Sequence, residues 1–224
     1  LNSWNETLTR TYIEPGDSSM TVFGYNSGGF GIYAHINTQS GLVNLARQTS
    51  GTEKMRDFVV RGDTIFSCWQ HAYVGSGTKR FSLLASRISD GQFVYQQFYD
   101  INYPGSSDPV SGNAGALSLD VDHEGYLYLT GYDYSDNYEP GLWGIVKVQA
   151  SDGIKVWDSL LDDTPGSYDH FSTGRLVWHA SNGKLWIGGE IEQDGGLATA
   201  KLIEVDKSNG ARLGDRTLGG KYQF

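Results

Sequence analysis

Acidic and amide side chains gather in one stretch of the sequence, GYDYSDNYEPG, which spans residues 131–141. Asp133, Asp136 and Glu139 supply the carboxylate oxygens that calcium prefers as ligands in proteins. Their spacing matches no known calcium loop, and Asp, Asn and Ser in loops also stabilise turns by hydrogen-bonding to their own backbone. We therefore expect no cofactor, with calcium at these three residues as the one alternative. The same two interpretations apply to the shorter loop DKSNG, which holds Asp206, Ser208 and Asn209.

Tyrosines lie in or beside the polar loops, at Tyr99, Tyr103, Tyr132, Tyr134, Tyr138 and Tyr168. Their rings provide contact area at small entropic cost, and loops on a rigid scaffold commonly carry recognition. A protein surface or a sugar suits them, because pyranose faces stack on aromatic rings while Asp and Asn bond hydroxyls. We take the last five of these tyrosines as candidate ligand-binding residues; the alternative is that they cap the edges of sheets.

Local sequence gives no support for hydrolytic catalysis. The histidines are scattered, and no nucleophile-elbow sequence surrounds a serine. Cys68 lies in an apolar strand, where a thiol is usually inert. We expect no catalytic residue. The alternative is a catalytic pair of side chains that come from distant repeats.

Composition narrows the class of partner. The formal net charge of -9 argues against nucleic acid and anionic membrane surfaces, since both are bound through basic patches. No segment approaches the roughly 20 apolar residues that span a bilayer. A single cysteine excludes an intrachain disulfide and a cysteine-rich zinc site. A glycosylation acceptor sequence at Asn5 and the abundance of Gly, Ser, Thr, Asn and Tyr favour an extracellular or cell-surface location.

Pairs of strands are predicted on the two sides of Glu124-Gly125 and of Asp152-Gly153. Apolar and polar residues alternate in ALSLDVD before the first of these turns and in YLYLTGYD after it. This alternation is typical of half-buried β-strands, and glycine supplies the positive φ that a tight turn needs. Similar pairs recur along the chain, and no segment has the periodicity of an amphipathic helix.

The strand pairs form a repeat. Turn glycines at Gly41, Gly91, Gly153 and Gly210 are separated by 50, 62 and 57 residues. Four strands per period of this length predict an all-β protein, a β-propeller of four-stranded blades that pack on one another around an axis. We expect a single propeller domain over 1–224, with repeats at roughly 30–80, 81–140 and 141–199 and partial repeats at 1–29 and 200–224.

The two partial repeats decide between an open and a closed propeller. Trp4 aligns with Trp157, and Leu213-Gly214 falls at the equivalent place near the C-terminus, so the chain repeats the strand with which it began. A ring closed by its own termini would have complementary ends instead. We therefore favour part of a propeller with more blades, with a closed four-bladed ring as the alternative.

Two blocks of the sequence resemble known propeller repeats. ALSLDVDHEGYLYLTGYD and AKLIEVDKSNGARLGDRTLGG are similar to the SBBP type of β-propeller repeat. VQASDGIKVWD resembles the PQQ-like repeat, in which a tryptophan follows a glycine by four positions; Gly153 and Trp157 hold these places, whereas Leu45, Tyr95 and Gly214 depart from the pattern. The resemblance implies a propeller and would permit a quinone cofactor. Such proteins usually hold the quinone near two adjacent cysteines, however, and Cys68 stands alone, so Trp157 is interpreted as a packing residue between blades.

These observations favour a non-enzymatic function. We expect an extracellular structural or adhesion scaffold that presents Tyr- and Asp-rich loops to a protein partner, to further blades or to copies of itself. The alternative is a carbohydrate-binding propeller or a polysaccharide-active enzyme. The sequence by itself does not separate the two.

Overall fold

The computed structural model shows strands and turns, and the residues that it describes contain no helix and hence none that could cross a membrane. The described residues are 7–13, 19–25, 31–48, 55–74, 78–101, 115–133, 142–161, 171–179, 182–193, 197–218 and 222–223.

The strands form four antiparallel sheets. In each sheet four strands that are consecutive in the chain lie side by side in the same order. The first sheet contains β1 (Thr7–Ile13), β2 (Ser19–Tyr25), β3 (Gly31–Asn37) and β4 (Val43–Gln48). The second contains β5 (Met55–Arg61), β6 (Thr64–Val74), β7 (Thr78–Arg87) and β8 (Phe93–Tyr99). The third contains β9 (Gly115–Val121), β10 (Tyr126–Asp133), β11 (Leu142–Gln149) and β12 (Lys155–Leu160). The fourth contains β13 (Phe171–His179), β14 (Lys184–Gln193), β15 (Leu197–Asp206) and β16 (Arg212–Thr217), and β17 (Tyr222–Gln223) pairs with its β15.

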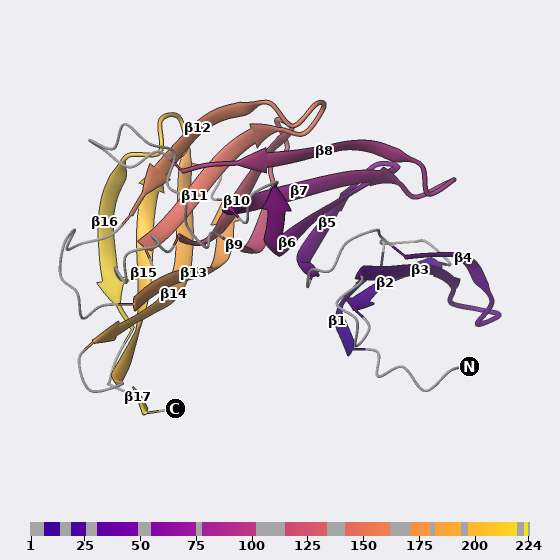
Figure 1. Ribbon diagram of the computed structural model, residues 1–224, viewed down its shortest axis with the longest axis horizontal. Helices are drawn as coiled ribbons and strands as arrows, with labels where there is room; N and C mark the ends of the chain where they lie inside the picture. The colour runs from indigo at the N-terminus through magenta and orange to yellow at the C-terminus, as the bar shows by residue number, and fades with distance from the viewer. Residues whose placement is uncertain are drawn as a thin grey trace.

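The four sheets follow one another in an arc (Figure 1). Their first strands, β1, β5, β9 and β13, contact one another in that order, and their fourth strands lie on the outside. Burial follows the same gradient, since β9 is mostly buried and β16 mostly exposed. The first and fourth sheets stand at the two ends of the arc and do not close a ring. The prediction of an all-β propeller with four-stranded blades is confirmed, in its open form.

The sheets are out of phase with the predicted repeats. The segments 30–80, 81–140 and 141–199 each join the outer hairpin of one sheet to the inner hairpin of the next. The two ends of the chain, expected as partial repeats, contribute strands to the first and fourth sheets, and Trp4, on which the alignment of the two ends depends, lies outside the described residues. The error arises because turn glycines mark hairpins but not which hairpins share a sheet. Segment 26–30 connects two strands of the first sheet, and segment 49–54 connects the first sheet to the second. The two segments are similar in length, so length does not show where one sheet ends.

Apolar side chains fill the spaces between neighbouring sheets. Alternation along β10 directs Leu127 and Leu129 into the cluster between the second and third sheets, and Tyr128 into the cluster between the third and fourth. All three are 0% exposed, and burying one such side chain contributes about 2 kcal/mol. Because both faces of the third sheet are covered in this way, its strands are held in fixed positions.

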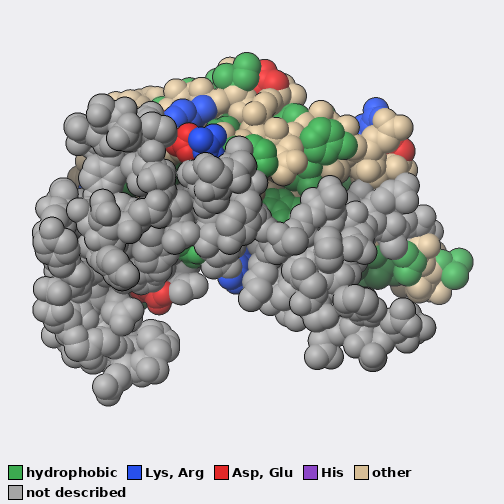
Figure 2. All heavy atoms as spheres, viewed as in Figure 1, with side chains coloured by type: hydrophobic (Ala, Val, Ile, Leu, Met, Phe, Trp, Pro, Cys, Tyr) green, Lys and Arg blue, Asp and Glu red, His purple; other side chains and the backbone are tan. Residues whose placement is uncertain are grey.

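The outer strands expose apolar side chains to solvent. Figure 2 shows such side chains, in green, along the upper edge of the molecule, where Figure 1 places β8 and β12. The exposed apolar residues of these two strands are Phe93, Val94 and Val156. β8 and β12 therefore present some apolar side chains on the outside of the arc.

Candidate functional site

Most of the residues predicted to bind a ligand lie outside the described part of the chain. This holds for Tyr103, Tyr134, Tyr138, Tyr168, Asp136, Glu139 and Asn5, and for the side chain of Asp133. Their roles in ligand binding, calcium binding and glycosylation stay predictions. Tyr132 is described: it lies in β10 with 6% of its surface exposed, so its ring is packed inside the protein rather than presented to solvent.

The tight turns of the second, third and fourth sheets lie at one rim, which we call the turn rim. Within each sheet the two turns are joined by one backbone hydrogen bond, from Ile88 N to Asp63 O, from Ala150 N to Gly125 O and from Lys207 N to Gly183 O. Between sheets, Arg61 Nη2 donates to His123 O at 3.1 Å. Lys207 Nζ in turn lies 3.2 Å from Glu124 Oε2. These contacts make the turn rim continuous across the three sheets.

The strands that lead into the Tyr- and Asp-rich segments all end at the opposite rim. Antiparallel order makes β8, β10 and β12 run away from the turn rim. Segments 102–114, 134–141 and 162–170 follow these strands directly, and they contain Tyr103, Tyr134, Tyr138 and Tyr168. The fold therefore attaches the predicted ligand-binding tyrosines, apart from Tyr132, to strand ends at one rim.

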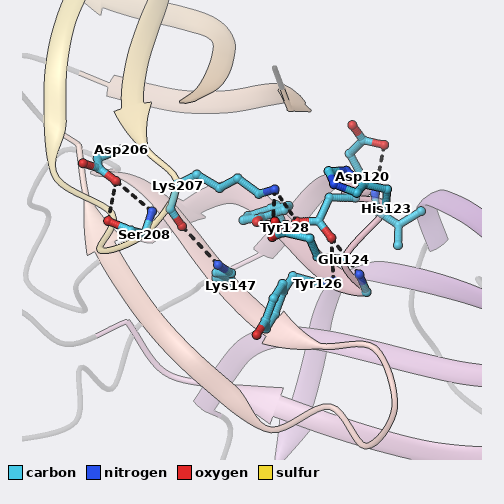
Figure 3. Close-up of polar contacts among 12 residues, drawn as sticks. Asp120, His123, Glu124, Tyr126, Tyr128, Lys147, Asp206, Lys207 and Ser208 are labelled. Carbon is cyan, nitrogen blue, oxygen red and sulfur yellow. Dashed lines mark hydrogen bonds and ion pairs between the residues drawn. The ribbon is translucent and has the colours of Figure 1, made fainter. Parts of the chain in front are cut away.

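A cluster of charged residues joins the third and fourth sheets at the turn rim (Figure 3). At its centre, Asp122 Oδ1 accepts hydrogen bonds of 2.8 Å from the backbone N of Gly125 and of Tyr126. Its Oδ2 accepts the hydroxyl of Tyr128 at 2.8 Å and the ammonium of Lys207 at 2.8 Å. Asp122 is 2% exposed, and each carboxylate oxygen has two donors. We call Asp122, Glu124, Tyr128, Lys147 and Lys207 the clasp.

The two lysines of the clasp link the third sheet to the fourth. Figure 3 shows Lys207 extending from the fourth sheet toward Glu124 and Tyr128. Lys147 Nζ, from β11, donates to the carbonyl oxygen of Lys207 at 3.1 Å. The same ammonium lies 4.1 Å from the ring centroid of Tyr126, within cation–π range. Both ends of Lys207 are thus bound to the third sheet.

The protonation states of the clasp are fixed by these contacts. Burial acts to raise the pKa of Asp122, but the hydrogen bonds from Lys207, Tyr126 and Tyr128 outweigh it and hold that pKa at about 2. Burial, followed by the hydrogen bond to Asp122, raises the pKa of the Tyr128 hydroxyl. Burial acts to lower the pKa of Lys207, yet its bonds to the two carboxylates raise it. At neutral pH none of these three groups is prepared to exchange a proton, which suits an ion pair between sheets rather than acid–base catalysis.

A second buried carboxylate joins the second and third sheets. Asp57 Oδ2, from β5, accepts the hydroxyl of Ser118 at 2.8 Å and the backbone N of Leu119 at 3.1 Å. Its Oδ1 accepts the backbone N of Phe58 at 2.9 Å. Local sequence carries no signal for the contacts of Asp57 with β9 or of Asp122 with Lys207, because these partners belong to a different sheet.

Two aromatic residues make the same contact between consecutive sheets. The hydroxyl of Tyr95 donates to Ala150 O at 2.9 Å, and the indole nitrogen of Trp157 donates to Lys207 O at 3.3 Å. Each acceptor lies three residues before a turn glycine, and the ring covers that glycine. The interpretation of Trp157 as a packing residue between blades is confirmed. Tyr95 departs from the PQQ-like pattern only in residue type, since it occupies the same place.

The remaining candidates have structural roles. Cys68 is 0% exposed in the apolar cluster between the second and third sheets, which does not fit a thiol pair beside a quinone. Asp206 Oδ1 accepts the backbone N of Ser208 at 2.7 Å and its hydroxyl at 2.6 Å, so the turn-stabilising interpretation of DKSNG is confirmed. Among the described residues, no three His, Cys, Asp or Glu side chains gather in a way that could hold a metal ion.

Comparisons with known proteins bear on the fold. No family model matches the chain, and no curated protein matches its sequence. Among solved structures, the fold is similar to the quinohemoprotein alcohol dehydrogenase from Comamonas testosteroni, with a TM-score of 0.57 and 14% identity over 91% of this chain and 34% of that one. The chain thus spans about a third of the length of that dehydrogenase.

Two further solved structures are similar to this chain. The β-propeller domain of Cps50 (Swd1) from Myceliophteria thermophila gives a TM-score of 0.59 at 10% identity, covering 97% of this chain and 59% of that one. The endo-arabinase from Bacteroides thetaiotaomicron gives 0.54 at 11% identity, covering 98% and 82%. Identities this low show a shared fold and not a shared activity. The chain has a β-propeller fold.

Proposed function

We propose that this chain is a non-enzymatic scaffold of the SBBP type, located outside the cell, that binds a protein partner through the rim opposite the turn rim. One observation carries the proposal: the strand ends that lead into segments 102–114, 134–141 and 162–170 all reach that rim. A rigid sheet framework with Tyr-rich segments at one rim is an arrangement suited to recognition.

Three buried polar side chains support a scaffold. Asp57, Asp122 and Lys207 each bond to a neighbouring sheet, and these bonds fix the position of the sheets rather than leave a group available for reaction. Each of the three is at most 8% exposed. A binding role uses this rigidity directly, because a preorganised framework lowers the entropic cost of binding.

The experiment compares two variants, each of which is altered at one rim only. The loop variant replaces Tyr103, Tyr134, Tyr138 and Tyr168 by Ser. The turn-rim control replaces the exposed residues His123 and Ser151 by Ala. A photo-crosslinking amino acid at position 134 first captures the partner from the extracellular fraction of the source. The purified partner is then titrated against the wild-type chain and both variants.

We expect the loop variant to bind the captured protein at least about tenfold more weakly, and the turn-rim control to bind it as the wild type does. Equal affinity for all three chains would overturn the proposal. A glycan array tests the alternative: sugar binding that the loop variant loses would assign the rim to carbohydrate recognition instead.

A further inference from the structure

The outer turn of the first sheet has the same hydrogen bonds as the outer turns of the other sheets. Gly41 N donates to Asn37 O at 2.9 Å, and Asn37 N donates to Leu42 O at 2.9 Å. In the fourth sheet, Gly210 and Asp206 make the equivalent pair of bonds at 2.8 Å each. The turn glycines also share their backbone conformation, with φ of 70° at Gly41 and 77° at Gly210. The first sheet therefore presents the same turn as the sheets that follow it.

The strands that follow these turns also have one register. Trp157 lies opposite Lys147 and Tyr95 lies opposite Ala85, each at a register shift in its outer hairpin. The same shift occurs in the first and fourth sheets, where the equivalent residues are Leu45 and Gly214. The position four residues after each turn glycine is thus structurally equivalent in all four sheets.

An aromatic ring at this position covers the turn glycine of the next sheet. A β-carbon at Gly153 would lie 2.7 Å from the Tyr95 ring, and one at Gly210 would lie 2.8 Å from the Trp157 ring. Both glycines are buried. Gly41 differs, because it is exposed and no described atom lies within 4 Å of where its β-carbon would be. The turn of the first sheet has the form of an acceptor without the ring that covers the other two.

We propose that Gly41 and the carbonyl oxygen of Thr38 form an acceptor site for the outer strand of a further propeller blade. Thr38 is exposed and lies three residues before Gly41, as Ala150 and Lys207 lie before their turn glycines. The residue that docks there is a Trp or Tyr four positions after a turn glycine, with its ring on Gly41 and its N–H or O–H donated to Thr38 O. The site continues the series of contacts between consecutive sheets, and it does not rest on the proposed binding partner.

The fourth sheet of this chain does not supply that ring. Its equivalent residue is Gly214, which has no side chain, and no described atom lies within 4 Å of where a β-carbon would be. Neither this sheet nor a second copy of the chain therefore offers a Trp or Tyr at the docking position. The occupant is a blade with a different outer strand.

The empty space at Gly214 provides a probe for the site. The β-carbon of a Gly214→Trp substitution meets no described atom within 4 Å, and the substitution gives the fourth sheet a donor ring. The probe chain carries Gly214→Trp together with Gly41→Asn, so that it donates without accepting. Asn tolerates the left-handed conformation of this turn, and its side chain occupies the place of the ring. Circular dichroism and thermal melting verify that each variant is folded, and Gly214→Tyr replaces the probe if the Trp variant is not.

Sedimentation velocity then measures binding of the probe to two acceptors at up to about 100 µM. We expect a complex with the wild-type chain and at least about tenfold weaker binding to the Gly41→Asn chain. A Gly214→Phe probe, which lacks the donor, should bind the wild type several-fold more weakly. Equal binding to both acceptors, or no complex with a folded probe, overturns the proposal. Self-association of the wild type that Gly41→Asn abolishes would assign the site to a second copy, and would overturn it as well.

Discussion

The indole nitrogen of Trp157 donates a 3.3 Å hydrogen bond to the carbonyl oxygen of Lys207, which belongs to the next sheet. The backbone N–H of Lys207 donates to Gly183 O and so joins the two turns of the fourth sheet. Lys207 thereby connects both hairpins of the fourth sheet to the third sheet. Tyr95 and Ala150 repeat the arrangement one sheet earlier, which makes it a regular device of this fold.

Removing the indole donor tests how much this hydrogen bond contributes. Trp157→Phe keeps an aromatic ring but loses the N–H, and the Lys207 carbonyl retains the Lys147 ammonium as a donor. We expect a loss of about 1 kcal/mol in the free energy of unfolding, measured by urea denaturation. In Lys147→Met with Trp157→Phe the carbonyl loses both donors, so the double variant should lose more than the sum of the single losses. Additive losses would show that the two donors act independently.

The sequence predicted the local features of the fold but not its grouping into sheets. Alternation and turn glycines identified the hairpins, because both signals lie within a few adjacent residues. Which hairpins share a sheet depends on pairing across segments such as 26–30. This segment and 49–54, which leads to the next sheet, both contain glycine and are similar in length, so the sequence does not distinguish them. The repeats were therefore placed out of phase, although their number and their strand content were correct.

The difference between local signals and long-range pairing also explains why the clasp was not predicted. Asp122 and Lys207 are far apart in sequence and meet only because the third and fourth sheets pack together. No local pattern marks such a pair. The Tyr95 contact does have a local signal, because Tyr95 lies four residues after Gly91 and its hydroxyl takes the place of the indole donor of the PQQ-like pattern.

Alanine substitutions at two turn glycines separate the cost of backbone strain from the cost of steric overlap. Gly153 and Gly183 have φ of 74° and 78°, so alanine is strained at both by about 1 kcal/mol. A β-carbon at Gly153 would also lie 2.7 Å from the Tyr95 ring and 2.7 Å from the Gln97 side chain, whereas one at Gly183 has no described atom within 4 Å. We expect Gly153→Ala to cost about 1–2 kcal/mol more than Gly183→Ala in urea denaturation. Equal costs would mean that the Tyr95 ring moves aside freely.

Gly144 tests the packing between the second and third sheets. A β-carbon there would overlap Cδ1 of Ile101, which is 1% exposed. Gly144→Ala should cost about 2 kcal/mol, and Ile101→Val, which removes that carbon, about 1 kcal/mol. The double variant should be more stable than the sum predicts by about 1 kcal/mol, as measured in a double-mutant cycle. Gly214→Ala is the control and should change stability little, because its β-carbon has no described atom within 4 Å and Gly214 has no positive φ. A cycle without coupling would contradict this packing.

The clasp predicts how stability depends on pH. The pKa of Asp122 falls from 3.8 to about 2 on folding, so its contribution is fully present above pH 4 and is lost as pH falls toward 2. This shift corresponds to about 2 kcal/mol. Asp122→Asn should therefore lower the free energy of unfolding at pH 7 by about 2 kcal/mol and flatten its decline between pH 4 and pH 2. Urea denaturation at stepped pH measures both.

The half-exposed partner of the same lysine is the matched control. Glu124 has 51% of its side chain exposed, so its ion pair with Lys207 is screened by water, and Glu124→Gln should cost less than about 1 kcal/mol. A steep acid decline that survives in Asp122→Asn would mean that other carboxylates dominate it. In that case the ion pair between Lys207 and Asp122 would not be what keeps the third and fourth sheets together in acid.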